Sequence, residues 1–146
     1  MMKKGIVSLS CGACLMVVSS LSAAAEINLV SHRNTESQLR DGMKLATGRM
    51  TCRETHTGFH VWMNARQDGG RPEHYIVQNS KGIQHELRVR IGGNGWISSF
   101  GEAQRGIFRL GKEEQAIFDV IVDGDQKVIP GEYMLSISGE CIVLGR

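Results

Sequence analysis

The sequence predicts an all-β domain, an immunoglobulin-like β-sandwich that lacks its final strand. Short segments that alternate apolar and polar residues are separated by glycine-rich turns, which is typical of antiparallel strands. Two cysteines, Cys52 and Cys141, stand early and late in this pattern, as in sandwiches whose second and sixth strands are bridged. Only five residues follow Cys141, and a further strand with its turn needs more.

The first 25 residues are expected to be an export signal rather than part of the domain. After a basic start, residues 6–18 are mostly apolar and residues 22–25 are small, as a signal peptidase requires. The apolar run is shorter than the roughly 20 residues that span a membrane. Cleavage before Glu26 leaves residues 26–146 as the domain. A lipoprotein signal that is processed at Cys14 is an alternative, although Cys11 stands where such signals usually carry leucine.

Removal of residues 1–25 changes both the charge and the cysteine count. It takes away Lys3 and Lys4 and no acid, so 15 of the 17 basic residues remain against 15 acidic ones. The net charge falls to zero, and no electrostatic argument for nucleic-acid binding is left. Cys52 and Cys141 are then the remaining cysteines of an exported chain, which predicts one disulfide between them. Two buried free thiols are the alternative.

The expected strands follow from period-two alternation bounded by turns. They cover residues 26–30, 44–53, 58–64, 73–78, 84–91, 104–110, 115–122 and the segment from 133 to 143. Residues 37–43 are expected to form a turn, Pro130-Gly131-Glu132 another turn, and Asp123-Gly124 a tight turn. Residues 115–122 are nearly all apolar, which predicts a strand that is buried on both faces.

Two of these strands carry the cysteines on their core faces. In the last strand, one face receives Tyr133, Leu135, Ile137, Gly139, Cys141 and Val143 by alternation. In residues 44–53, the face of Cys52 is shared by Ala46, Gly48 and Met50. Trp62 stands ten residues after Cys52, where such folds bury a tryptophan, yet alternation places it opposite the apolar residues of its strand. Its position, in the core or at the surface, is left open.

The missing strand has a consequence for assembly. Its absence leaves backbone groups of the last strand unpaired and an apolar groove open, which is costly for an isolated chain. A strand from another chain can fill this gap. The first strand begins almost at once after Glu26, so the processed chain is expected to accept a strand, to have none to donate, and to end a fibre.

Metal, cofactor and catalytic sites are not expected. His56 and His60 flank Gly58 at a loop-to-strand boundary, and in an extended segment they are about 13 Å apart. Asp119, Asp123 and Asp125 do not continue into a calcium loop. No nucleophile elbow or phosphate-binding loop occurs. The alternative to a fibre subunit is a self-contained secreted sandwich that binds carbohydrate or protein, with stacking candidates Trp62, Trp96 and Tyr75.

Several segments carry a family resemblance: Gln38–Gly42, Ala46–Arg49, Cys52–Glu54, His56–Asn64, His85–Arg90 and Pro130–Tyr133. They resemble the AfaD/DraD invasin family, which comprises minor, tip-associated subunits of Dr afimbrial adhesins, with similar subunits in aggregative adherence fimbriae. The resemblance implies assembly through a periplasmic chaperone and an outer-membrane usher, completion by a donor strand of the major pilin, and export to the fimbrial tip. It also implies attachment to or entry into host cells, for some members through integrins. It carries over the disulfide pair Cys52 and Cys141 and no ligand-binding residue.

Overall fold

The computed structural model describes residues 2–10, 16–18, 20–21, 25–32, 37–79, 82–99, 105–128 and 132–143. Strands joined by turns and bends make up this part of the chain, and it includes no helix that could cross a membrane. The strands are β1 (Met2–Ser10), β2 (Met16–Val18), β3 (Ser20–Leu21), β4 (Ala25–Ser31), β5 (Gln38–Leu39), β6 (Lys44–Cys52), β7 (Gly58–Met63), β8 (Arg66–Gln67), β9 (His74–Asn79), β10 (Gly82–Gly92), β11 (Ile97–Ser98), β12 (Ile107–Leu110), β13 (Gln115–Val122), β14 (Gln126–Lys127) and β15 (Glu132–Ile142).

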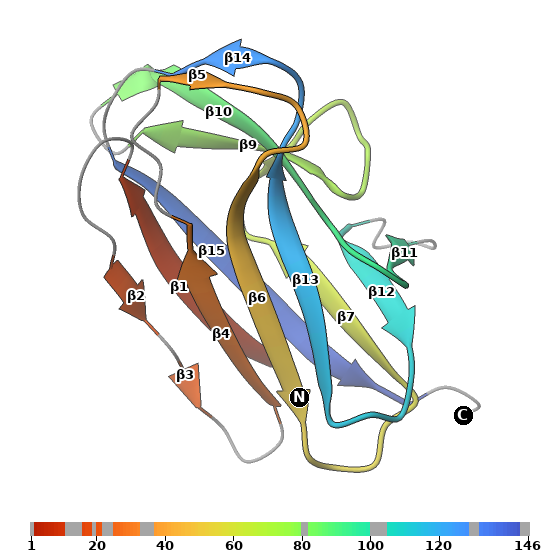
Figure 1. Ribbon diagram of the computed structural model, residues 1–146. Coiled ribbons are helices and arrows are strands. Elements are labelled where there is room, and N and C mark those ends of the chain that lie inside the picture. The colour runs from red at the N-terminus through yellow and green to blue at the C-terminus, as the bar shows by residue number, and fades with distance from the viewer. Residues whose placement is uncertain are drawn as a thin grey trace.

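An antiparallel sheet that curves back on itself forms the body of the molecule (Figure 1). Along it the strands run β11-β12-β7-β15-β9-β10-β13-β6-β4-β3, with β1 beside β15 and β8 beside β9. A separate ribbon joins β5 to β14. The part around β4, β6 and β13 faces the part around β7 and β15, which gives the two layers of a sandwich.

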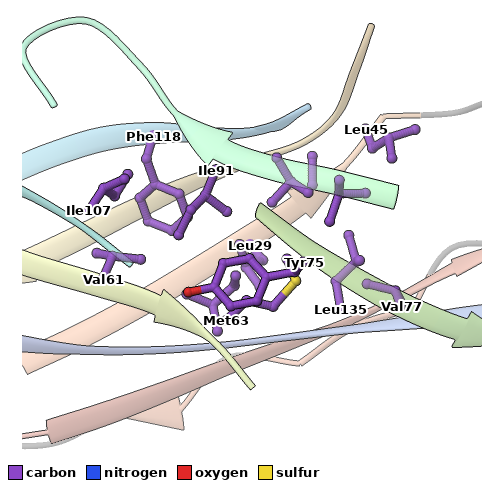
Figure 2. Close-up of a cluster of buried hydrophobic side chains, with 14 of the residues drawn as sticks. Leu29, Leu45, Val61, Met63, Tyr75, Val77, Ile91, Ile107, Phe118 and Leu135 are labelled. Atoms are coloured by element: carbon purple, nitrogen blue, oxygen red, sulfur yellow. The ribbon is translucent and has the colours of Figure 1, made fainter. Parts of the chain in front are cut away.

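The core lies between these layers, and the alternation of the sequence decides which side chains enter it. Phe59, Val61 and Met63 point inward from β7, and Figure 2 shows Val61 and Met63 close to Tyr75 and Phe118. A Cβ atom at Gly48 would overlap the Phe118 ring. Glycine in β6 therefore makes room for the largest side chain of the neighbouring strand.

The predicted core faces of the cysteine-bearing strands are confirmed along most of their length. The prediction is wrong for Val143, which follows β15 and is 45% exposed, and Leu45, on the opposite face of β6 by alternation, is also buried, where the pairing of β6 with β13 shifts register. Tyr133, Leu135 and Ile137 are fully buried in β15, and Met50 and Cys52 are buried in β6. A disulfide joins Cys52 to Cys141 across the two layers, with their Cα atoms 6.0 Å apart. Within the described residues no strand follows β15, as the incomplete sandwich requires.

Three expectations need comment. The prediction that residues 115–122 are buried on both faces is wrong: Ala116, Phe118 and Val120 are buried, but Ile117 is 45% exposed, because β13 alternates like a strand with one solvent face. The turn predicted at Pro130-Gly131-Glu132 lies largely outside the described residues. Residues 37–43 form the short β5 and a turn at Asp41-Gly42, where Gly42 has a φ of 87°.

Candidate strand-accepting site

The edge of β15 that faces away from β7 is the candidate functional site. On its other edge β15 pairs with β7, from Ile137 opposite Met63 to Ile142 opposite Gly58. On the edge that faces away from β7, β15 pairs with β1 along the whole of β1, from Met2 opposite Glu140 to Ser10 opposite Glu132. The strand direction is antiparallel. An additional strand of nine residues therefore fits here with a continuous ladder.

Strand β1 comes from the segment that the sequence assigns to an export signal. In this unprocessed chain it lies between β15 and β4 (Figure 1), while β3, from the same segment, pairs with β4. Cleavage before Glu26 remains a prediction. It would remove β1 and expose the backbone groups of β15 and the apolar side chains of β4 at once.

The middle of the site, beneath Gly5 of β1, leaves little space between β15 and Ile27 of β4. Gly5 lies opposite Ile137, and a Cβ atom added to it would stand 2.8 Å from Ile27 Cγ2 and 3.0 Å from the Ile27 carbonyl oxygen. Gly139 of β15 is similarly close, since its Cβ would come 2.9 Å from Ile27 Cδ1. A strand in this position can carry only glycine where Gly5 stands unless Ile27 and the β4 backbone move.

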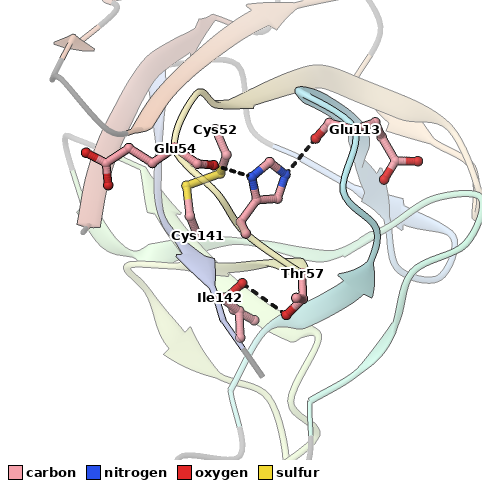
Figure 3. The surroundings of a disulfide bond; sticks show 7 residues. Cys52, Glu54, Thr57, Glu113, Cys141 and Ile142 are labelled. Atoms are coloured by element: carbon pink, nitrogen blue, oxygen red, sulfur yellow. Dashed lines mark hydrogen bonds between the residues drawn. A yellow bond between two sulfur atoms is a disulfide. The ribbon is translucent and has the colours of Figure 1, made fainter. Parts of the chain in front are cut away.

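The disulfide end of β15 is held by contacts from two loops (Figure 3). The buried His56 ring places Nδ1 2.7 Å from the Glu54 carbonyl oxygen and Nε2 2.6 Å from that of Glu113. The Thr57 backbone N–H donates to the Ile142 carbonyl oxygen at 2.7 Å. The last residues of β15 are thus fixed to the loop before β7 as well as to β6.

The open question about Trp62 is answered by its neighbours on the outer face of the sheet. Its side chain points away from the core but is only 4% exposed, because the Arg105 guanidinium lies 4.3 Å from the ring centroid and the His60 ring 4.8 Å from it. Tyr75 is buried in the core, and burial raises the pKa of its phenol. Trp96 donates from Nε1 to the Ile117 carbonyl oxygen at 2.7 Å. The expectation that these three rings offer stacking surfaces is therefore wrong for Trp62 and Tyr75.

The predicted turn at Asp41 is held by charges. Arg90 Nη1 lies 2.8 Å from Asp41 Oδ1 and 3.2 Å from Asp123 Oδ1. Its hydrogen bond, together with one from the Gly124 N–H, lowers the pKa of Asp41, and Asp41 in turn raises the pKa of Arg90. Burial raises the pKa of Asp123, but the hydrogen bond from His74 and the charges of the nearby arginines together lower this pKa by more, so the net shift is downward. This network ties the turn before β6 to the turn after β13.

The histidines and aspartates of the sequence are placed in structural contacts. His56 lies in the loop before β7 and His60 within it, with Nδ1 of His60 3.2 Å from Glu140 Oε1. Asp119 accepts a hydrogen bond from Thr47 Oγ1, and Asp125 accepts one from the Asp41 N–H. Within the described part of the chain, no three His, Cys, Asp or Glu side chains are grouped so as to hold a metal ion.

Sequence reasoning missed one residue of interest, Arg105. It lies in the expected strand 104–110 but precedes the observed β12, and no local pattern predicts that it covers Trp62. The close approach of the segment of Arg105 to β7 depends on Gly106. This residue has a φ of 76°, and a Cβ atom there would overlap the Val61 carbonyl oxygen. A glycine beside an arginine at the start of a strand is the only local signal.

Comparison with known proteins places these features in a family. Residues 35–139 match the model of the Enterobacteria AfaD invasin protein. Protein AggB of Escherichia coli is 59% identical over 98% of this chain and 98% of its own length. Among solved structures, the E. coli Hda pilus minor tip subunit HdaB is 51% identical, with a TM-score of 0.79 over 83% of this chain and 85% of that one. A chain from a study of fibronectin binding and biofilm formation by the AAF fimbriae of enteroaggregative E. coli is 55% identical, with a TM-score of 0.76 over 82% and 89%.

Proposed function

Because this chain belongs to the AfaD invasin family and is, like its relatives, a non-enzymatic minor subunit of a surface fimbria, we propose that a neighbouring pilin completes its fold. The donor is a strand of the major pilin that occupies the edge of β15. The chain then stands at the fimbrial tip, where it mediates attachment to, or entry into, host cells.

One observation carries the proposed strand exchange: the edge of β15 pairs with a nine-residue strand along its whole length. That strand belongs to residues 1–25, which we expect to be removed on export. The vacated edge then has unpaired N–H and C=O groups beside an apolar groove, and strand addition satisfies both. The disulfide and the loop contacts hold β15 in place while the occupant changes.

Assembly requires that the groove be covered before the donor arrives. We infer that a periplasmic chaperone lends a strand to this edge and that an outer-membrane usher presents the subunit to the pilin. The same transient covering explains why export of an incomplete sandwich does not lead to edge-to-edge aggregation. The chain reaches the cell surface as part of the fimbria.

The host-cell partner is proposed as a surface or matrix protein. Integrins are one candidate class by family resemblance, and fibronectin is another, because a related chain comes from fimbriae that were studied for fibronectin binding. A self-contained secreted module that stacks sugars is the competing function. The burial of Tyr75 and the covering of Trp62 by Arg105 disfavour it.

The decisive experiment compares residues 26–146 alone with the same residues extended at the C-terminus by a flexible linker and a donor strand of the cognate major pilin. We expect the bare chain to aggregate or unfold and the extended chain to unfold cooperatively at a much higher temperature. A matched control carries leucine in the donor strand at the position opposite Ile137, where Ile27 leaves no room for a side chain. Equal stability of the bare and extended chains would refute the proposal.

A further inference from the structure

The outer face of the sheet carries a cation, Arg105, beside Trp62. Arg105 is exposed, and among the described residues its guanidinium forms no ion pair with a carboxylate. Arg66, on the same face, has such a partner and lies 2.6 Å from Glu86. Arg105 is therefore available to an external anion.

The position of Arg105 is built rather than accidental. Its guanidinium lies flat enough over the Trp62 ring to stand 4.3 Å from the centroid, and its carbonyl oxygen accepts a hydrogen bond from His60 Nε2 at 2.9 Å. The next residue, Gly106, donates to the Pro72 carbonyl oxygen at 2.6 Å and accepts from the Ser99 N–H at 3.1 Å. A guanidinium stacked on an aromatic ring keeps its N–H edge free for a planar, bidentate acceptor.

A pocket of about 300 Å³ opens beside this guanidinium. Its lining includes Arg105, Trp62, Asn64, Gln67 and Tyr75, and no acidic side chain is among the described residues that line it. The Tyr75 ring is buried in the core at the inner end, beside Met63 (Figure 2). Its hydroxyl is buried beside the backbone of Met63 and Gly106. Arg105 is the charged side chain among the described residues that line the pocket, which favours an anion such as a carboxylate as the ligand.

A second hollow continues from the first. It has a volume of about 440 Å³ and shares Asn64 and Ala65 with the pocket of Arg105. Ile76 and Met134 line it, and Met134 is 49% exposed although β1 lies beside β15. Ile76, Val77 and Met134 give this hollow apolar walls beside the polar Arg66 and Gln78. The two hollows together suit a peptide that places an acidic side chain beside Arg105 and an apolar side chain against Met134.

A sugar acid fits these features less well. Carbohydrate binding usually uses an exposed aromatic face, but the face of Trp62 is occupied by Arg105 and Tyr75 is buried. We therefore propose that this outer face, defined by Arg105, Trp62 and Met134, binds a protein partner through a glutamate or aspartate followed or preceded by an apolar residue.

The test measures binding of two amidated, N-acetylated peptides to the full chain by ¹H–¹⁵N NMR titration. One has the sequence Gly-Leu-Gly-Glu-Gly-Leu-Gly, and the other has glutamine in place of glutamate. We expect the first to shift the Trp62 indole and Arg105 side-chain resonances, and the second to bind about ten-fold or more weakly, as loss of a charge-assisted contact predicts. This comparison needs no mutation, so it cannot be confused with a folding defect.

Variants then locate the site. Arg105→Gln should weaken binding of the acidic peptide about ten-fold, and Arg105→Lys should restore only part of it, because lysine lacks the planar fork. Arg49→Gln is the matched control: it removes the same charge from an exposed position of β6 and should change affinity less than two-fold. Met134→Ser should weaken both peptides to the same degree.

Each outcome decides the matter. Equal binding of the two peptides, equal effects of Arg105→Gln and Arg49→Gln, or no binding at millimolar peptide would overturn the inference. Strong binding of N-acetylneuraminic acid without binding of the acidic peptide would replace it with a sugar-acid site.

Discussion

Loss of the Cys52–Cys141 disulfide should remove a large part of the domain's stability. The bridge closes a loop with a sequence separation of 89. The chain-entropy relation for a loop of this length gives about 15 cal/mol/K, or about 4.6 kcal/mol at 25 °C. Domains of this size are stable by about 5–15 kcal/mol in total. The urea midpoint of the Cys52→Ala/Cys141→Ala variant should therefore be lower than that of the wild-type protein by roughly 2–4 M. Tryptophan fluorescence is the measurement that follows the unfolding.

A control separates the cross-link from side-chain packing. Cys52 is buried, so replacement by alanine also leaves a small cavity. Wild-type protein unfolded in a reducing agent keeps both sulfur atoms and loses only the bond, and its midpoint should fall close to that of the double variant. If oxidised and reduced wild-type protein differ by less than about 1 kcal/mol, the chain-entropy reasoning is wrong for this domain.

Three further changes test separate parts of the fold. Gly106→Ala should cost at least about 1–3 kcal/mol in urea unfolding, because the residue has a φ of 76° and a Cβ there meets the backbone of β7; an unchanged midpoint would contradict this geometry. Phe59→Ala should cost about 3–5 kcal/mol, since the ring is fully buried in the core, and a loss below 1 kcal/mol would argue against its place there. The pKa values of Asp41 and Asp123 lie below their ordinary value of 3.8 in the folded chain. The stability that these carboxylates contribute to the fold is therefore complete above pH 3.8 and is lost as the pH falls through their lower folded-state pKa values. Arg90→Gln should flatten this acid-side loss of stability in a series of urea midpoints from about pH 6 to about pH 2.5, and an unaltered slope would remove Arg90 from the network.

Much of the fold follows from alternation alone. The core faces of β6, β7 and β15 are read directly from residues two apart, because each strand has one face in the core. The same alternation holds for residues 115–122, and the prediction of burial on both faces was wrong because it rested on the apolar composition of the segment. Ile117 and Ile121 are apolar, yet they share the outer row with Asp119, and that aspartate was the signal to follow.

The outer face could not be predicted in the same way. Alternation correctly places Trp62 on the side opposite Phe59 and Val61, but its burial depends on Arg105, which is distant in sequence. The close approach of the two chains depends on Gly106. Long-range contacts of this kind leave no periodic trace, whereas the disulfide pair was predictable from the export signal and the small number of cysteines.

The position of the disulfide also determines how the subunit bears force. A strand that pairs antiparallel along the whole edge of β15 is loaded in shear when a fibre is stretched, so its ladder bonds resist together rather than one at a time. Cys141 passes that load covalently to Cys52 in the opposite layer. The layers of the sandwich are thereby prevented from sliding apart near one end of β15, and under the proposed strand exchange the strand that would hold the neighbouring subunit is the one anchored across the core.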